Sequence, residues 1–416
     1  MSTFAKLAQR LQATGVLADP WLDGAPRFCT DPVLLTAAQH RELGAAAAGI
    51  ARVHDELARI VAASPELADA FFGLTQWQRG MWQCSAPHWH GIARADVFWT
   101  ADGPKVCELN SDTPCGEAEA VYGNRVAGAA RGLEDPNTRL PQRFVAMVQA
   151  WARTCGHRGP LTVGVLYPTE ITEDLSMVAA YREWLGAAGH AVVLGSPFNV
   201  GVHADGRALL FDTPCDVIVR HYKTDWFGER LPVADDDEPC ADRAPLVQPL
   251  LRLLAASVGH RTAIVNPFGA VLTQNKRALA FCWEELERFS RACQTAIRRW
   301  LPRTHRLELV REQLWQQKDL WVLKSDYGCE GAEVVVGAHV DQATWESTLA
   351  HVIARRWVAQ QYFAPLRDVR GDVVNHGVYV IGGAPAGVFA RVHAATAPTD
   401  GAARCAPVFV RTEENP

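Results

Sequence analysis

The chain has 416 residues, of which 48% are hydrophobic and 21% are charged, and its formal net charge is −5. This length allows two or three domains with substantial cores, and the composition is typical of a globular protein. The small negative charge excludes a general electrostatic affinity for nucleic acid or anionic lipid, so local basic residues would have to hold any anionic ligand. No apolar run approaches 18 residues and the first residues lack a signal-peptide pattern, so we expect a cytoplasmic protein without membrane or nucleic-acid partners.

The cysteines and histidines of the chain do not follow a metal-binding or disulfide pattern. Eleven cysteines are scattered without a CxxC pair, which argues against a disulfide framework and a structural zinc site. His88 and His90 would share one face of a strand, but two histidines without a third ligand favour a loop over a metal site.

Residues 1 to about 75 are rich in alanine and leucine and are predicted to be helical. From Asp31 to Leu67 the apolar residues recur at helical spacing, and Ser64-Pro65 is a signal for a helix to stop and restart. No cluster of titrating residues occurs in this region. We therefore interpret it as a packing scaffold.

A β-hairpin is predicted between residues 94 and 110. Its strands would be Arg94–Thr100 and Pro104–Asn110, joined by a three-residue loop in which Gly103 supplies a positive φ. A loop of this length places Thr100 opposite Pro104, and this pairing fixes the register of the whole hairpin.

Four polar side chains share one face of this predicted hairpin. The register places Asp96 opposite Glu108 and Arg94 opposite Asn110, and side chains at even spacing along a strand point the same way. Two carboxylates and an amide oxygen suit Mg²⁺, whose shell nucleotide phosphates normally complete. Because like charges opposed across strands are destabilising, a cation or Arg94 should compensate them. The alternative is a surface hairpin with a polar, solvated face.

Residues 159–265 alternate strands with a helix, which indicates a small parallel α/β domain. The predicted elements are the strand Leu161–Tyr167, the helix Thr172–Leu185, and the strands His190–Leu194 and Asp216–Arg220. No GxGxxG follows the first strand, so a nicotinamide-dependent oxidoreductase has little support. The acidic run Asp235–Glu238 is interpreted as a solvated loop.

The last third of the chain, from Asn266, contains two lysines in positions that suit phosphate binding. Lys276 lies near the start of a predicted helix, Arg277–Trp300, where a cation is disfavoured unless an anion is bound. Lys324 ends the predicted strand Leu320–Lys324, and the glycine-containing loop Ser325–Gly331 follows it. A loop of this kind can fold over phosphates because glycine permits close approach.

Three further strands are predicted after this loop and its return strand, Glu333–Gly337. Arg356–Phe363 is the first, and it contains Gln360 and Gln361. Gly377–Ile381 and Gly387–Arg391 form a hairpin around Gly382-Gly383-Ala384-Pro385, which is a strong turn signal.

Taken together, five motifs resemble the glutathionylspermidine synthase-like branch of the ATP-grasp ligases, from about residue 75 to the end. They are CELNSDTPCG, QNKRALAFCWE, LKSDYGCEG, VAQQYF and GVYVIGGAPAGVFARV. The metal-binding hairpin precedes the lysines in that branch, as it does here, because its fold is circularly permuted. The resemblance implies an α/β (α+β) protein with a circularly permuted ATP-grasp fold, a Rossmann-like pre-ATP-grasp domain and an N-terminal helical region.

The resemblance also implies a division of the chain into four parts. Residues 1–75 would be the helical region, and residues 76–158 the permuted part of the ATP-grasp core with the hairpin. Residues 159–265 would be the pre-ATP-grasp domain, and residues 266–416 the nucleotide-binding lobe.

The resemblance assigns roles to residues of the five motifs. It implies that Asp96, Glu108 and Asn110 ligate Mg²⁺. Arg94 would approach the transferred phosphate, and Arg391 would stabilise the acyl-phosphate and tetrahedral states. The residues that it implies for ATP binding are Lys276, Lys324, Gly328, Gly331, Gln360, Gln361 and Tyr362.

The activity that this family suggests is ATP-dependent amide or peptide bond formation between a small-molecule or peptide carboxylate and an amine. Related synthases often carry an arginine in the loop after the second lysine, where this chain has Cys329, and this departure weakens any inference to glutathione or spermidine. There is no room for the amidase domain of bifunctional relatives. The alternative is a nucleotide-binding partner or scaffold protein of the same fold that has lost catalytic activity.

Overall fold

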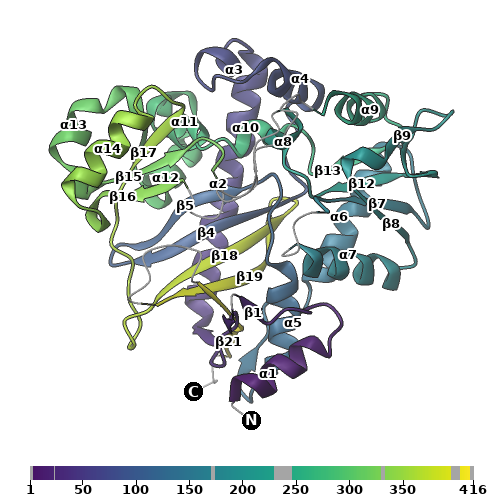
Figure 1. Cartoon of the computed structure of the whole chain (residues 1–416), viewed down its shortest axis with the longest axis horizontal. Helices are drawn as coiled ribbons and strands as arrows, with labels where there is room; N and C mark the ends of the chain where they lie inside the picture. The colour runs from purple at the N-terminus through teal and green to yellow at the C-terminus, as the bar shows by residue number, and fades with distance from the viewer. Residues whose placement is uncertain are drawn as a thin grey trace.

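The computed structural model describes residues 3–22, 24–169, 174–228, 246–328, 333–394 and 403–412. Within these ranges a central β-sheet lies between an α/β domain and a smaller lobe of strands and helices (Figure 1). The predicted site residue Gly331, its neighbour Cys329 and the acidic run at 235–238 lie outside the described residues.

The central sheet joins the predicted hairpin to the second hairpin near the end of the chain. Its strands in spatial order are β20 (Arg404–Ala406), β19 (Ala384–His393), β18 (Val373–Ile381), β4 (Ile92–Thr100) and β5 (Gly103–Asn110). All of its pairs are antiparallel. Gly382 and Gly383 both have positive φ between Ile381 and Ala384, as a two-residue hairpin turn requires, so the predicted second hairpin is confirmed.

The turn of the β4–β5 hairpin is one residue tighter than the sequence predicts. Thr100 pairs with Gly103 and not with Pro104. Gly103 has the predicted positive φ of 95°, but it already belongs to the returning strand. The predicted loop of three residues was therefore wrong, and an unbroken ladder from this turn would move every later pair by one residue.

A β-bulge restores the predicted pairs in the part of the hairpin that matters for the site. The register shifts beyond Val97, so that Cys107 is an extra residue on β5. Asp96 therefore pairs with Glu108, and Arg94 pairs with Asn110, as the sequence predicts.

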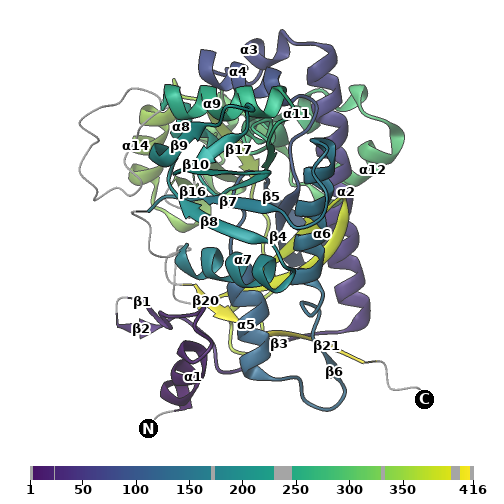
Figure 2. The same ribbon diagram turned by 90° about the vertical axis from the view of Figure 1, so that its right-hand side faces the viewer.

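The helix α2 (Ala37–Ala63) crosses one face of the central sheet (Figure 2). It begins at a capping box, in which the Thr36 hydroxyl accepts from the Gln39 backbone and the Gln39 side chain accepts from the Thr36 backbone. Its buried residues form one cluster with Ala95 and Val97 of β4. Because side chains alternate along a strand, Arg94 and Asp96 lie on the face of the sheet that α2 does not cover.

The N-terminal region also contains strands that the sequence does not predict. Its elements besides α2 are α1 (Thr3–Gln12), β1 (Trp21–Leu22), β2 (Ala25–Pro26), β3 (Val33–Leu35) and α3 (Leu67–Ala70). β3 pairs with β21 (Val408–Arg411), which also pairs with β6 (Leu133–Glu134). The prediction of a helix from Asp31 was wrong at its start, because the partner of this strand lies at the other end of the chain.

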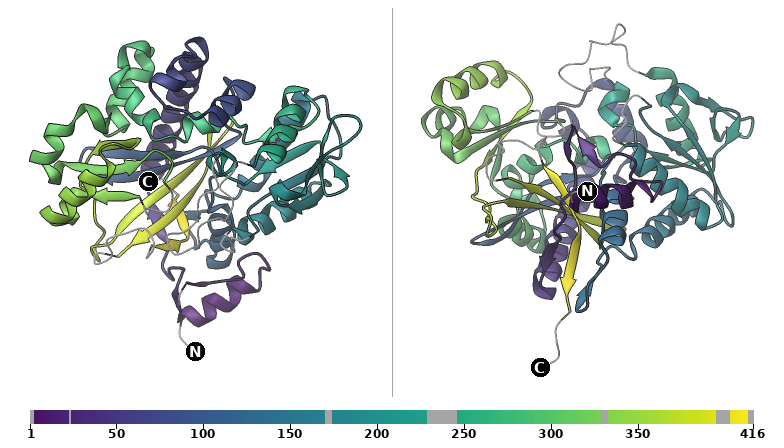
Figure 3. Two further views of the ribbon diagram at one scale, coloured as in Figure 1. Left: turned by 45° about the horizontal axis from the view of Figure 1, so that its top comes forward. Right: turned by 60° about the horizontal axis from the view of Figure 1, so that its bottom comes forward.

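The α/β domain contains a parallel sheet, as predicted, but it has four strands where the sequence predicts three. Its spatial order is β13 (Ala263–Val265), β12 (Val217–Arg220), β7 (Thr162–Leu166) and β8 (Ala191–Gly195). Helices α6 (Leu140–Thr154) and α7 (Leu175–Ala187) cover one face, and α9 (Val247–Val258) covers the other (Figure 3). A small antiparallel sheet that was not predicted consists of β9 (Val200–Val202), β10 (Ala208–Leu210) and β11 (Thr213–Pro214).

The smaller lobe is an antiparallel sheet with helices packed on one face. Its strand order is β14 (Thr304–Arg306), β17 (Trp357–Gln361), β15 (Trp321–Ser325) and β16 (Val334–Val336). Helices α13 (Arg311–Gln316) and α14 (Gln342–Val352) share a buried cluster with this sheet.

The predicted helix from Arg277 to Trp300 is two helices. α11 (Arg277–Glu284) ends before the short helix η2 (Leu286–Arg288), and α12 (Arg291–Trp300) follows. The Ser290 side chain accepts a hydrogen bond from the backbone of Cys293 and so caps α12. The serine was the available sequence signal for this break.

The remaining elements connect these layers. They are α4 (Gln76–Ser85), α5 (Glu117–Ala127), α8 (Thr224–Gly228), α10 (Ala270–Thr273), η1 (Pro197–Asn199), η3 (Leu307–Leu309), η4 (Lys318–Leu320) and η5 (Gly337–His339). α5 begins at Glu117, and His88 and His90 lie in the loop after α4. Across the described ranges no helix combines the length and apolar composition needed to span a bilayer.

Candidate active site

Asp96 lies between two arginines, on the face of the central sheet opposite α2. Arg94 Nε is 2.7 Å from Asp96 Oδ1, and Arg391 Nη2 is 2.7 Å from Asp96 Oδ2. Burial by itself raises the pKa of Asp96, but the two guanidinium groups outweigh it and hold the pKa below its usual value. Arg94 also donates to the Cys115 carbonyl at 2.8 Å. Arg94 and Arg391, which lie far apart along the chain, therefore meet at one carboxylate.

Strand β18 contributes two residues to this face that the sequence analysis missed. Gly377 pairs with Asp96, and a Cβ atom at Gly377 would lie 2.7 Å from Arg94 Cδ, so only glycine leaves room for the arginine. Asn375 pairs with Arg391 across β18 and β19 and donates a side-chain hydrogen bond to Asp96. Asn375 lies two residues before Gly377 and so on the same face of the strand, and this spacing was the available sequence signal for its place in the site.

Glu108 faces Lys276 of the smaller lobe. Lys276 Nζ is 3.2 Å from Glu108 Oε1 and also donates to the Gly328 carbonyl. Lys276 is buried, whereas the Glu108 side chain is 22% exposed. The lysine therefore joins the central sheet to the loop that follows β15.

Lys324 and Gln360 converge on the bulged residue Cys107. Lys324 Nζ donates to the Cys107 carbonyl at 3.1 Å, and Gln360 Nε2 donates to the same oxygen at 3.3 Å. The extra residue of a bulge leaves the strand ladder, so its carbonyl is available to such donors. Both side chains are buried, and they reach the hairpin from the same face of the small sheet.

Two of the predicted nucleotide-binding residues lie apart from this group. Gln361 is exposed and, by strand alternation, points to the opposite face of β17 from Gln360. Tyr362 follows the end of β17, where its backbone donates to Leu320 O and its ring contacts His339.

Asn110, at the end of the hairpin, is held through Gln274. Gln274 Nε2 is 3.5 Å from Asn110 Oδ1, and Gln274 Oε1 accepts from the backbones of Ser111 and Asp112 at 2.8 and 3.1 Å. Gln274 lies two residues before Lys276. The position of the lysine is thus tied to the end of the hairpin.

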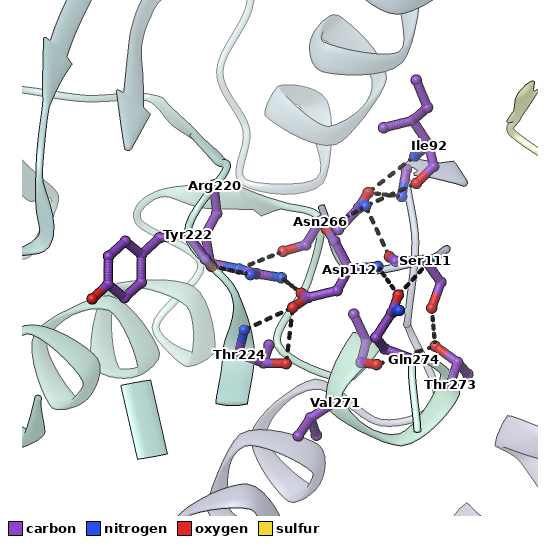
Figure 4. Close-up of polar contacts among 12 residues, drawn as sticks. Ile92, Ser111, Asp112, Arg220, Tyr222, Thr224, Asn266, Val271, Thr273 and Gln274 are labelled. Carbon is purple, nitrogen blue, oxygen red and sulfur yellow. Dashed lines mark hydrogen bonds and ion pairs between the residues drawn. The ribbon is translucent and has the colours of Figure 1, made fainter. Parts of the chain in front are cut away.

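A buried polar network fixes the segment after Asn110 against the α/β domain (Figure 4). The Asp112 carboxylate accepts from the Arg220 guanidinium and from the backbone and hydroxyl of Thr224 at 2.7 and 3.0 Å. The Asn266 amide donates to the carbonyls of Ile92, Ser111 and Asp112 at 2.8–2.9 Å. The network therefore holds both ends of the hairpin to strands of the α/β domain.

Glu117 is a buried carboxylate at the start of α5. Tyr181 of α7 donates to Glu117 Oε1 at 3.1 Å, and Glu117 Oε2 has no hydrogen-bond partner among the residues that the structure describes. Burial raises the pKa of Glu117 to about 7, although the charges of His221 and Arg94 act in the opposite direction. A group with this pKa is partly protonated near neutral pH.

The family described as glutathionylspermidine synthase preATP-grasp matches residues 22–411. The chain belongs to this family. Its fold is accordingly the circularly permuted ATP-grasp fold with a pre-ATP-grasp α/β domain. No curated protein matches the chain.

Two solved structures resemble this family member. A glutathione synthetase-like effector from Globodera pallida is 11% identical with a TM-score of 0.64, covering 98% of this chain and 96% of its own. A putative gamma-glutamylcysteine synthetase from Methylobacillus flagellatus is 16% identical with a TM-score of 0.47, covering 86% of this chain and 84% of its own. At these identities the first likeness extends to the fold alone, and the second adds nothing to it.

The oxygen donors of this ATP-grasp hairpin are compatible with Mg²⁺ bound together with a nucleotide. In the described part of the chain no group of three or more His, Cys, Asp or Glu residues could hold a metal by itself. Asp96, Glu108 and Asn110 provide two carboxylates and one amide, and Mg²⁺ is usually bound by one or two carboxylates plus substrate phosphates. The Asp96 carboxylate has about four acceptor positions and already accepts from Arg94, Arg391 and Asn375, so a metal ion would replace one of these donors.

Proposed function

We propose that the protein is an ATP-dependent carboxylate–amine ligase that forms an amide or peptide bond and releases ADP and phosphate. The observation that carries the proposal is the convergence of four basic side chains on one hairpin from separate parts of the chain. Arg94 and Arg391 contact Asp96, and Lys276 contacts Glu108. Lys324 donates to the carbonyl of the bulged residue, Cys107. Membership of the family supports the same activity.

The proposed reaction proceeds in two transfers. An oxygen of the substrate carboxylate attacks the γ-phosphorus of ATP, the bond to the β,γ-bridging oxygen breaks, and ADP leaves with that oxygen. The amine nitrogen then attacks the acyl carbon, phosphate leaves with the acyl oxygen, and the nitrogen loses a proton to solvent. Both transfers develop negative charge on oxygen, so positioned cations are the main requirement.

The basic residues would divide this work by their positions. Lys276 and Lys324 would bind the ATP phosphates in place of the Gly328 and Cys107 carbonyls that they contact now. Arg94 and Arg391 would stabilise charge on the transferred phosphoryl group and on the acyl phosphate. Gln360 lies beside Lys324 and would contribute to the nucleotide site, together with the backbone around Gln361 and Tyr362 and the glycines Gly328 and Gly331.

Asp96, Glu108 and Asn110 would hold Mg²⁺, which would neutralise charge on the bound phosphates. Asp96 has a further role that depends only on the chain itself. Because it bonds to both Arg94 and Arg391, it keeps the two guanidinium groups side by side without nucleotide. This arrangement reduces the reorganisation needed when the substrates bind.

The site assignment is tested by the melting temperature with and without MgATP. A ligand that binds only the folded state raises the melting temperature. We expect a clear shift for the wild type and for Lys6→Ala, an exposed lysine of α1, but little shift for Glu108→Ala or Lys324→Ala. Equal shifts in all four proteins would rule out the assigned nucleotide site.

The activity is tested by ADP release with panels of carboxylates and amines. A ligase should release ADP only when a suitable carboxylate and amine are both present. A shift with MgATP but no ADP release with any pair would favour the alternative, a nucleotide-binding partner protein without ligase activity. ADP release that no acceptor changes would indicate a different reaction.

A further inference from the structure

A cavity lies on the other side of the central sheet from the proposed nucleotide site. Its volume is about 650 Å³, and its walls come from α2, from the loop and first turns that lead into α6, and from the β18–β19 hairpin. Pockets for small molecules usually measure about 300–1,000 Å³. The cavity is lined by Val378 and Val388, which point toward α2 and therefore away from Asp96 and the two arginines.

Small and apolar residues form the floor of this cavity. They are Gly44, Ala45 and Ala48 of α2, with Val378 and the segment 385–388 of the hairpin. Gly44 faces Pro385, where an added Cβ atom would come within 3.1 Å of the ring. The helix and the hairpin thus meet closely at Gly44, and the space beside this contact stays open.

Arginines form the rim of the cavity. Arg41, Arg139 and Arg143 line it, and the Arg139 side chain has no hydrogen-bond or ion-pair partner within the described ranges. Arg143 donates to the Pro385 carbonyl and pairs with no carboxylate that the structure describes. Such guanidinium groups present a planar set of donors that matches carboxylate and phosphate oxygens.

Two carboxylates also line the cavity, and neither pairs with Arg139 or Arg143 in the described part of the chain. Asp135 Oδ1 accepts from the Asn124 side chain and the Asn137 backbone, which are neutral donors, so this carboxylate keeps its negative charge. Glu134 lies at the exposed edge. Burial and the neighbouring Arg41 lower the pKa of His40, so this histidine is neutral at physiological pH. With three arginines and two carboxylates, the lining has an excess of one positive charge over an apolar floor.

We propose that this cavity is a binding site for a small organic anion. The carboxylate or phosphate group of the ligand pairs with Arg139 and Arg143, and its apolar part covers the floor at Ala45 and Ala48. The site does not depend on the ligase activity proposed above. It shares the strand β19 with Arg391, which lies three residues after Val388 and, by strand alternation, on the opposite face of the sheet.

Binding is tested by isothermal titration calorimetry with phenyl phosphate and phenylacetate as probes. We expect at least one probe to bind the wild type, and the double variant Arg139→Gln, Arg143→Gln to bind it at least about tenfold more weakly. Arg153→Gln, on the last turn of the same helix, should bind like the wild type. Lys324→Ala should also bind like the wild type, which separates this cavity from the nucleotide site.

Two further measurements distinguish a shaped anion site from charge alone. Ala45→Trp fills the floor from an exposed position of α2 and should abolish probe binding while the melting temperature stays near the wild-type value. Benzyl alcohol, which lacks the charge, should bind far more weakly than phenyl phosphate. The proposal is overturned if neither probe binds, if the arginine variant binds normally, if Lys324→Ala removes binding, or if benzyl alcohol binds equally well.

Discussion

Asp96 faces Glu108 across the β4–β5 hairpin because Cys107 bulges out of the strand between Glu108 and the turn. The turn alone would place Asp96 opposite Cys107, and the bulge moves Glu108 into that position. The same bulge exposes the Cys107 carbonyl, which accepts from Lys324 and Gln360. One irregularity in the strand therefore both aligns the two carboxylates and contacts the smaller lobe.

The fit of Arg94 beside Gly377 yields the first prediction. In Gly377→Ala the new Cβ atom would overlap Arg94 Cδ, so the arginine must move away from Asp96. We expect the free energy of unfolding to fall by about 1–3 kcal/mol, as for other overpacked sites, and the MgATP-dependent rise in melting temperature to shrink. Urea denaturation and melting curves measure the two effects.

Gly123 provides the matched control for this substitution. It lies within α5, and a Cβ atom there would meet no other atom within 4 Å. Gly123→Ala should therefore leave the nucleotide shift unchanged and stabilise the helix by up to about 1 kcal/mol. Similar effects of both substitutions would mean that the space at Gly377 is not needed for Arg94.

The parts of the fold that the sequence predicts are those determined by local pattern. The second hairpin follows from adjacent glycines, and the parallel sheet follows from apolar strands separated by helical segments. The pairing of Asp96 with Glu108 was predicted from a loop one residue too long, and it holds because the bulge offsets the shorter turn. A bulge leaves no clear pattern in a single sequence, since Cys107 fits either register.

The parts that could not be predicted depend on contacts between distant segments. Val33–Leu35 forms a strand only because β21 lies beside it, and no local periodicity reveals such a partner. Asn375 and Gly377 matter to the site because β18 lies next to β4, which the sequence does not specify. The sequence therefore did not predict that Asn375 and Gly377 contact Arg94 and Asp96 from the neighbouring strand.

The buried pair of Asp112 and Arg220 yields the second prediction. The Arg220 side chain is fully buried, so Asp112→Asn leaves its charge without a counter-ion. Breaking a buried ion pair from one side typically costs about 3–5 kcal/mol, and we expect the free energy of unfolding to fall by that amount. Arg220→Met combined with Asp112→Asn should cost less than the sum of the two single variants, because no unpaired charge remains.

An exposed ion pair offers the comparison for this experiment. Arg79 and Asp69 are 2.7 Å apart, but their side chains are 41% and 50% exposed. Asp69→Asn should cost less than about 1 kcal/mol in the same denaturation experiment. Equal costs at the two sites, or additive effects of Asp112→Asn and Arg220→Met, would contradict the role assigned to burial.

Glu117 yields the third prediction, which concerns pH. Its pKa is about 7 in the folded protein, above the value of 4.5 for an ordinary glutamate, so the folded state binds more protons than the unfolded state between these pH values. Stability from this group is therefore fully present below about pH 4.5 and is lost as the pH rises through 7. At about 1.4 kcal/mol per pKa unit, the loss amounts to at most about 3.5 kcal/mol.

Two variants test this assignment in opposite directions. Glu117→Gln cannot ionise, so the free energy of unfolding should fall less between pH 5 and pH 8 than it does in the wild type. Tyr181→Phe removes the hydrogen bond that favours the ionised carboxylate, so the pKa of Glu117 should rise further and the fall should become steeper. Denaturation curves at several pH values measure both slopes. If Glu117→Gln keeps the wild-type slope, the buried carboxylate does not carry this pH dependence, whatever its effect on stability at a single pH.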